Sequence, residues 1–220
     1  MLLILSLMTF ALAIPNPTWS ELYQSANWVQ KSSLSTDVGT VVVYTKKVDN
    51  FPCFRGETVA DILPTSENLS TMVTIAGDAA SALDWSSADL TEAVELGRTD
   101  TYIDYYQYLS IPLLSDRYWF LRGYPERDGS SYLFRWERLI EGGPYTEFYE
   151  TVQRNHPNEE ETPINLGAWV FTPKENQTHI QYIICSHPGG NVPTMLQSVA
   201  TEDSLPTNIQ DMIQETHRRK

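Results

Sequence analysis

The stretch YYQYLSIPLLSDRYWFLR, residues 105–122, holds the side chains with the clearest capacity for chemistry. It places large aromatic rings beside one acid, Asp116, and two arginines, Arg117 and Arg122. A pocket for an amphipathic small molecule needs an apolar wall and a few fixed polar groups. Two ordinary core strands would show the same composition. The stretch is therefore either packed core or two walls of a cavity for an apolar ligand.

Catalytic motifs are missing from the sequence. We find no nucleophile elbow, no phosphate-binding loop and no Ser/His/Asp arrangement. Two cysteines and four scattered histidines match no zinc spacing. We therefore expect no metal, no cofactor and no enzymatic activity. The alternative is a small-molecule enzyme that uses a strand carboxylate, Asp104 or Glu137, as a general acid–base group.

Composition predicts one globular domain. The chain has 220 residues, of which 41% are hydrophobic and 20% charged. Its formal net charge of −13 excludes nucleic acid as a partner and opposes lasting adsorption to anionic lipid. We expect a monomer whose contact with membranes is transient.

The N-terminus resembles a signal peptide. Residues 2–14 are apolar except for Ser6 and Thr9, a length too short to span a bilayer. Ala11-Leu12-Ala13 supplies the small residues that a signal peptidase requires. We predict a signal peptide over 1–13, a single domain over 14–220, and a periplasmic or secreted location. A buried N-terminal helix is the alternative.

Cys53 and Cys185 allow a single intramolecular disulfide. An oxidising compartment would permit the bond, but spacing in the sequence does not fix the distance between the two residues. Two buried free thiols fit the sequence equally well.

The order of periodic segments predicts an α+β fold. A helix with Thr18 as its cap is indicated by apolar residues at helical spacing, namely Trp19, Leu22, Tyr23, Ala26 and Val29. Two strands follow, over 38–48 and 51–62, and then two short helices between 66 and 85. Six strands are predicted over 92–98, 101–112, 117–124, 131–139, 167–173 and 179–185.

Residues 141–167 read as a loop, and an amphipathic helix ends the chain, with Pro206 expected to kink or restart it. Consecutive strands joined by hairpins imply a curved antiparallel sheet. The long C-terminal helix is the element available to cover that sheet.

Three segments resemble START domains, the steroidogenic-acute-regulatory-protein-related lipid-transfer family. IPLLSDRYWFLR resembles the family segment P-x-x-S-D-R-D-F-x-x-x-R, and LDWSSADLTEAVELG resembles the stretch after its two short helices. GAWVFTP followed by YIICSHPGGNVPTMLQ resembles the closing pattern D-P-G-G-x-I-P. The resemblance spans residues 19–219. Tyr118 and His187 depart from it, because each replaces a family acid.

The resemblance implies a helix-grip fold of the Bet v 1-like superfamily, with a hydrophobic tunnel for one lipid or sterol and no catalysis. It also implies that an acid and an arginine on neighbouring strands hold the ligand's polar end. The matching positions here are Asp104, thirteen residues before Arg117, and Arg122, with the register shifted by one. Arg117 itself is expected to be structural. The alternative for Asp104 is that it faces water.

A second charged pair competes for the same role. Arg135 and Glu137 lie two apart on one predicted strand and share a face. The tunnel wall is predicted to hold aromatic residues of these strands, namely Tyr106, Tyr108, Phe120 and Trp136 among eight candidates. Alternation allows only every second residue to point inward, so the sequence does not decide which face lines the tunnel. An interaction module with a closed cavity is a third possibility.

Overall fold

The computed structural model describes residues 18–48, 51–110, 115–190 and 194–220, without the side chains of 194–201. The helices are α1 (Trp19–Tyr23), α2 (Ser66–Gly77), α3 (Ala82–Trp85), the 3-10 turn η1 (Ile140–Gly142), α4 (Thr146–Asn155) and α5 (Thr194–Arg218). The strands are β1 (Val29–Thr36), β2 (Gly39–Val48), β3 (Phe51–Ala60), β4 (Leu90–Arg98), β5 (Ile103–Leu109), β6 (Arg117–Asp128), β7 (Ser131–Arg138), β8 (Glu160–Glu161), β9 (Ile164–Lys174) and β10 (Gln177–His187). The predicted signal segment lies outside the described residues.

The strands form one sheet in the order β1-β2-β3-β10-β9-β7-β6-β5-β4. Every pair along this path is antiparallel, and the short β8 pairs with β6 in parallel. Hairpins join β5 to β6, β6 to β7 and β9 to β10, whereas the β3–β10 pair joins segments far apart in the sequence. The predicted α+β class with an antiparallel sheet is confirmed.

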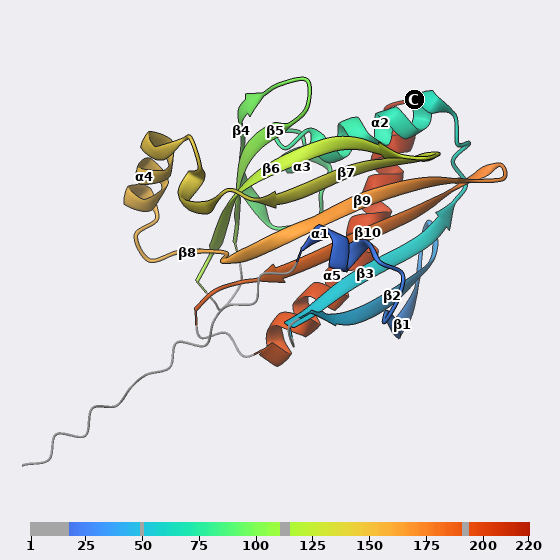
Figure 1. Ribbon diagram of the computed structural model, residues 1–220, viewed down its shortest axis with the longest axis horizontal. Coiled ribbons are helices and arrows are strands. Elements are labelled where there is room, and N and C mark those ends of the chain that lie inside the picture. Colours follow the sequence, from blue (N-terminus) through green and yellow to red (C-terminus); the bar gives the residue numbers. More distant parts are fainter. Residues whose placement is uncertain (1–17, 49–50, 111–114, 191–193) are drawn as a thin grey trace, which may run out of the picture.

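Helices cover both faces of the sheet (Figure 1). We call the face crossed by α5 and α2 the inner face, and the opposite one, which carries α1 and α4, the outer face. On the inner face α5 packs against β2, β3 and β10, and α2 packs beside it over β7 and β9. The long C-terminal helix therefore grips the sheet as predicted. None of the described helices is long and apolar enough to cross a membrane.

Helix α5 approaches the sheet most closely at Gly56 on β3. A Cβ atom built there would lie 2.8 Å from Ile209 Cδ1, closer than real carbon atoms pack. Ile209, Met212 and Ile213 are buried against the inner face, so the apolar side of this part of the helix packs on the sheet. Pro206 lies inside the helix, which continues through it instead of restarting.

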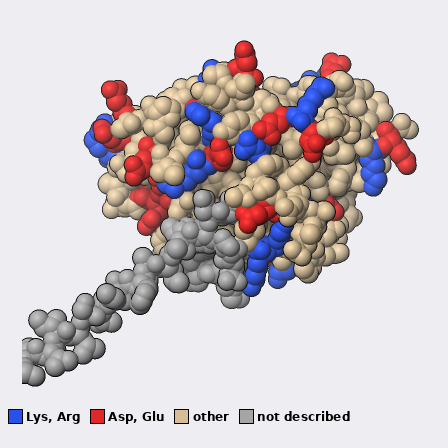
Figure 2. All heavy atoms as spheres, viewed as in Figure 1, with Lys and Arg blue, Asp and Glu red and all other residues tan. Residues whose placement is uncertain are grey.

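The outer face has two separate apolar clusters. Under α1, Leu22 packs with strand residues that include Leu133 and Val170. Under α4, Val152 and Phe148 pack on the aromatic residues of β5 and β6. Figure 2 shows this side of the molecule, where basic and acidic side chains are interspersed. The outer face is therefore a packed and solvated surface.

Three elements differ from the sequence-based expectation. Helix α1 ends at Tyr23, so Ala26 and Val29 are not part of it. The chain reverses at Asn27, whose φ of 68° is incompatible with a continuing helix, and Val29 opens the unpredicted strand β1. Residues 146–155, read as loop, form α4, whose Phe148, Tyr149 and Val152 lie at helical spacing and pack on the sheet.

Cys53 and Cys185 form a disulfide between the neighbouring strands β3 and β10. Both are fully buried, in the outer-face cluster under α1, and the bond closes a loop with a sequence separation of 132 residues. A cross-link over so long a loop restricts the unfolded chain and stabilises the folded one.

Replacing both cysteines with alanine should lower the free energy of unfolding by about 2–4 kcal/mol. Urea denaturation followed by circular dichroism measures the change. Wild-type protein in reducing buffer should lose a similar amount, whereas the double variant should not respond to the reductant. Equal stability of the oxidised wild type and the variant would contradict a stabilising disulfide.

Candidate functional site: a pocket between the sheet and the C-terminal helix

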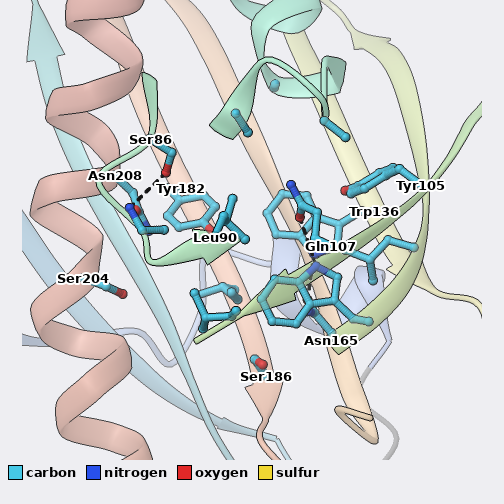
Figure 3. Close-up of a pocket in the computed structure, with 18 of the residues that line it drawn as sticks. Ser86, Leu90, Tyr105, Gln107, Trp136, Asn165, Tyr182, Ser186, Ser204 and Asn208 are labelled. Atoms are coloured by element: carbon cyan, nitrogen blue, oxygen red, sulfur yellow. Dashed lines mark hydrogen bonds between the residues drawn. The ribbon is translucent and has the colours of Figure 1, made fainter. Parts of the chain in front are cut away.

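A pocket of about 560 Å³ opens on the inner face, between the sheet, α2, the loop from α3 to β4, and α5 (Figure 3). This volume lies within the range of about 300–1,000 Å³ that small-molecule sites occupy. Six aromatic residues from five strands form most of its wall, namely Tyr105, Trp119, Phe134, Trp136, Trp169 and Tyr182. Ile75, Leu90 and Leu121 add aliphatic surface. The interior is therefore suited to an apolar guest.

Strand alternation decides which residues reach this pocket. On β5, Tyr105, Gln107 and Leu109 line it, and the residues between them point to the outer face. On β6, Arg117, Trp119 and Leu121 line it in the same way, because each pairs across the ladder with one of these β5 residues. Odd-numbered positions of both strands thus build the pocket wall.

Two tryptophan–amide pairs are built into the wall. The indole nitrogen of Trp119 donates to Gln107 Oε1 at 3.0 Å, between directly paired residues of β6 and β5. The indole nitrogen of Trp136, on β7, donates to Asn165 Oδ1 of β9, also at 3.0 Å. Figure 3 shows Gln107, Trp136 and Asn165 within the lining. Each amide is thereby fixed in one orientation.

Two tyrosines add hydroxyl groups to the same wall. Burial, with a smaller contribution from the nearby Tyr182, raises the pKa of Tyr105 far above its usual value. Burial raises the pKa of Tyr182 as well, and its ring stacks on Trp169 with centroids 4.2 Å apart. Both phenols therefore stay neutral at every physiological pH.

Arg117 is the sole cationic side chain among the described residues of the pocket lining. It is 3% exposed and donates to the backbone carbonyl oxygens of Ser115 and Asp116. These hydrogen bonds hold the start of β6, in agreement with the structural role expected for Arg117. Its position in the pocket wall was not foreseen.

The mouth of the pocket is polar and lies beside α5. Its hydroxyl and amide side chains come from the α3–β4 loop and from α5, namely Ser86, Ser87, Ser204, Thr207 and Asn208. Asp211 of α5 is buried and accepts hydrogen bonds from the backbone nitrogen and the hydroxyl of Ser87, at 2.6 and 2.9 Å. This contact ties the loop to the helix.

Asp104 and Arg122 do pair, but on the outer face. Arg122 Nε and Nη2 each lie 2.7 Å from a carboxylate oxygen of Asp104, which is completely buried. Tyr145, just before α4, donates to the same carboxylate at 3.0 Å. Hydrogen bonding to Asp104 raises the pKa of Arg122, against the opposing effect of burial. Both the predicted pocket position and the alternative of a water-facing Asp104 are therefore wrong.

The other predicted residues divide in the same way. Tyr106, Tyr108 and Phe120 lie in the outer-face cluster under α4, where Tyr106 and Phe120 have ring centroids 5.1 Å apart. Arg135 and Glu137 also lie on the outer face, half-buried and exposed respectively, at 3.7 Å. Trp136 alone of the eight predicted residues lines the pocket. The sequence placed the strands correctly, and the wrong face was chosen for β5 and β6.

Gln107 and Asn165 were missed, although the sequence carries a signal for the first. Gln107 is the one amide in the run IDYYQYL, flanked by tyrosines at both neighbouring positions. A polar residue within an otherwise apolar strand indicates a specific contact on its face. Asn165 lies at the start of β9, in a stretch read as loop, and gives no such signal. No cluster of possible metal ligands occurs within the described part of the chain.

The sequence matches no family model and no curated protein. Solved structures match closely in shape. A STAR-related lipid transfer protein from Xanthomonas axonopodis superposes with a TM-score of 0.69 at 19% identity, covering 87% of this chain and 99% of that one. Human STARD10 gives a TM-score of 0.69 at 14% identity, covering 90% and 76% of the two chains.

Human StAR-related lipid transfer protein 5 gives a TM-score of 0.66 at 13% identity, covering 90% of each chain. The chain therefore has the fold of START domains, as its motifs predicted. Identities this low establish the fold and leave the ligand to be argued from the pocket.

Replacing Asp104 with asparagine should weaken the fold and leave the pocket unchanged. The variant removes a charge that holds Arg122 and Tyr145, which should cost about 1–3 kcal/mol of unfolding free energy. Chemical denaturation measures the stability, and titration with an apolar fluorescent probe measures the pocket. Wild-type stability together with weakened probe binding would show that Asp104 acts on the ligand.

Proposed function

We propose that this protein binds a single lipid or sterol-like molecule in the inner-face pocket and carries it between membranes. The observation that carries the proposal is an aromatic-lined pocket of about 560 Å³ beneath a gripping helix. Burying apolar surface there removes it from water and stabilises the complex by about 25 cal/mol for each Å². The START fold supports the same class of ligand, and two of the similar structures are those of proteins named for lipid transfer.

The pocket dimensions favour a compact or single-chain guest. A sterol or one acyl chain occupies a volume of this order, whereas a phospholipid with two long chains needs more room. The polar mouth beside α5 provides a place for a headgroup or for exit toward a membrane surface. The Ser87–Asp211 contact is the polar tie that opening of this mouth would break.

An enzymatic function has less support. The two carboxylates considered for acid–base chemistry, Asp104 and Glu137, lie on the outer face, away from the pocket. The acids of the lining, Asp78 and Asp89, are half-buried and exposed. The buried carboxylate beside the mouth, Asp211, already accepts two hydrogen bonds from Ser87. A closed interaction module is disfavoured by the open volume itself.

Extraction of protein purified from its native host should yield one lipid per chain by mass spectrometry. Replacing Ser186 of β10, which lines the pocket, with tryptophan should fill the space and lower the yield at least tenfold. The matched control is Ser33→Trp on the exposed part of β1. Empty protein that also fails to bind sterols, phospholipids and fatty acids would contradict the proposal.

We also propose that the protein works outside the cytoplasm. A buried disulfide between Cys53 and Cys185 is typical of proteins that fold in an oxidising compartment. N-terminal sequencing of the mature protein should give a start near Ile14, in the periplasmic or secreted fraction. A chain that begins at Met1 in the cytoplasmic fraction would overturn this proposal.

A further inference from the structure

The two amides of the pocket wall have no freedom to flip. An indole nitrogen can only donate a hydrogen bond, so the atom that faces Trp119 must be the oxygen of Gln107. The same reasoning fixes the oxygen of Asn165 toward Trp136. The tryptophans are themselves held by their places in the wall between strands. Each amide must therefore present its NH2 group elsewhere.

The NH2 groups are the parts of these amides left for a ligand. Among the described residues, neither Gln107 Nε2 nor Asn165 Nδ2 has a hydrogen-bond partner, and neither is sealed from a water-sized molecule. Asn165 is 6% exposed, so its free donor sits in an almost fully buried side chain. A donor that water reaches can exchange that water for an acceptor on a bound ligand, which keeps the hydrogen bond and orients the ligand.

The remaining polar groups of the interior add to the donors of the pocket wall. The hydroxyls of Tyr105 and Tyr182 line the pocket and have no partner within the described ranges. Arg117, also in the lining, can only donate. Both amide oxygens already accept one indole hydrogen bond, and the acids Asp78 and Asp89 are partly or fully exposed to solvent. The interior therefore offers amide and guanidinium donors beside hydroxyls that can donate or accept.

We propose that the NH2 groups of Gln107 and Asn165 donate to carbonyl or carboxylate oxygens of the apolar ligand, with Trp119 and Trp136 as positioning residues. The inference rests on the proposed function and specifies its ligand class. Arg117 in the same lining disfavours cationic guests such as alkylammonium ions. The inference also gives a role to two cross-strand pairs that a plain apolar pocket would not need.

A pair of isosteric ligands tests this recognition. Dodecan-2-one and 2-methyldodec-1-ene share one shape and differ in an oxygen replaced by a methylene group. Isothermal titration calorimetry gives the affinity of the intact chain for each, and their ratio isolates the contribution of the oxygen. We expect the ratio of ketone to alkene affinity to fall about tenfold in each of two variants of Gln107.

The first variant, Gln107→Glu, keeps the oxygen that accepts from Trp119 and replaces the free donor with an acceptor. The second, Gln107→Met, removes the donor without adding charge, and serves if the first does not fold. Asn165→Asp repeats the first change at the second pair. The matched control is Gln30→Glu, on the exposed part of β1, which should keep the wild-type ratio.

The outcomes separate the two proposals. A lower ratio in the Gln107 and Asn165 variants, with alkene affinity retained, supports recognition of an oxygen acceptor. An unchanged ratio in folded variants, with both ligands still bound, overturns the donor assignment and leaves the carrier function standing. Failure of wild-type protein to bind either ligand counts against the carrier function itself.

Discussion

The structure depends on the two-residue repeat of an extended strand, in which successive side chains point to opposite faces of the sheet. Strands β5 and β6 carry aromatic residues at neighbouring positions, such as Tyr105 and Tyr106 or Trp119 and Phe120, so the repeat sends rings to both faces of the sheet. Helix α4 covers those on the outer face, and the pocket receives those on the inner face. Because the two sets interleave in sequence, one composition produces a packed cluster and a binding wall at once.

The pocket exists because α5 contacts the sheet unevenly. At Gly56 the missing side chain lets the helix lie almost on the backbone of β3, and Ile209 fills the contact. Farther along the sheet, toward β5 and β6, the inner face is covered by α2 and by the α3–β4 loop. The hydrogen bonds from Ser87 to Asp211 fix the loop to the helix. The pocket is the volume between the close α5–β3 contact and the cover formed by α2 and the α3–β4 loop.

Most of the architecture could be predicted from the sequence, because it follows from periodicity. Strand periodicity from residue 92 onward and an apolar stripe in the last helix imply a gripped antiparallel sheet, and the START motifs give its family of folds. The short elements were harder. Helix α4 is only ten residues long and lies in a stretch whose glycines and prolines favour a loop, and β1 follows a reversal at Asn27 that leaves no periodic trace.

The sequence alone does not determine which face of β5 and β6 lines the pocket. Asp104 and Gln107 both interrupt an apolar strand, and either could serve a ligand. The odd three-residue spacing puts them on opposite faces, so only the packing of α4 against Tyr106 decides between them. Asp104 was predicted to contact the ligand because a buried ionised group needs a specific partner. The uncharged amide, held by an indole, was the residue that reached the interior.

The division of charge between the faces bears on what the pocket can do. Asp104 pairs with Arg122 on the outer face, and Glu126 and Glu137 both pair with Arg135. Both arginines also lie over tyrosine rings. The sheet wall of the pocket carries neutral polar side chains and Arg117, and the acids Asp78 and Asp89 of its lining lie toward solvent. The donors of such a wall are already in place to hold and orient an uncharged or anionic oxygen.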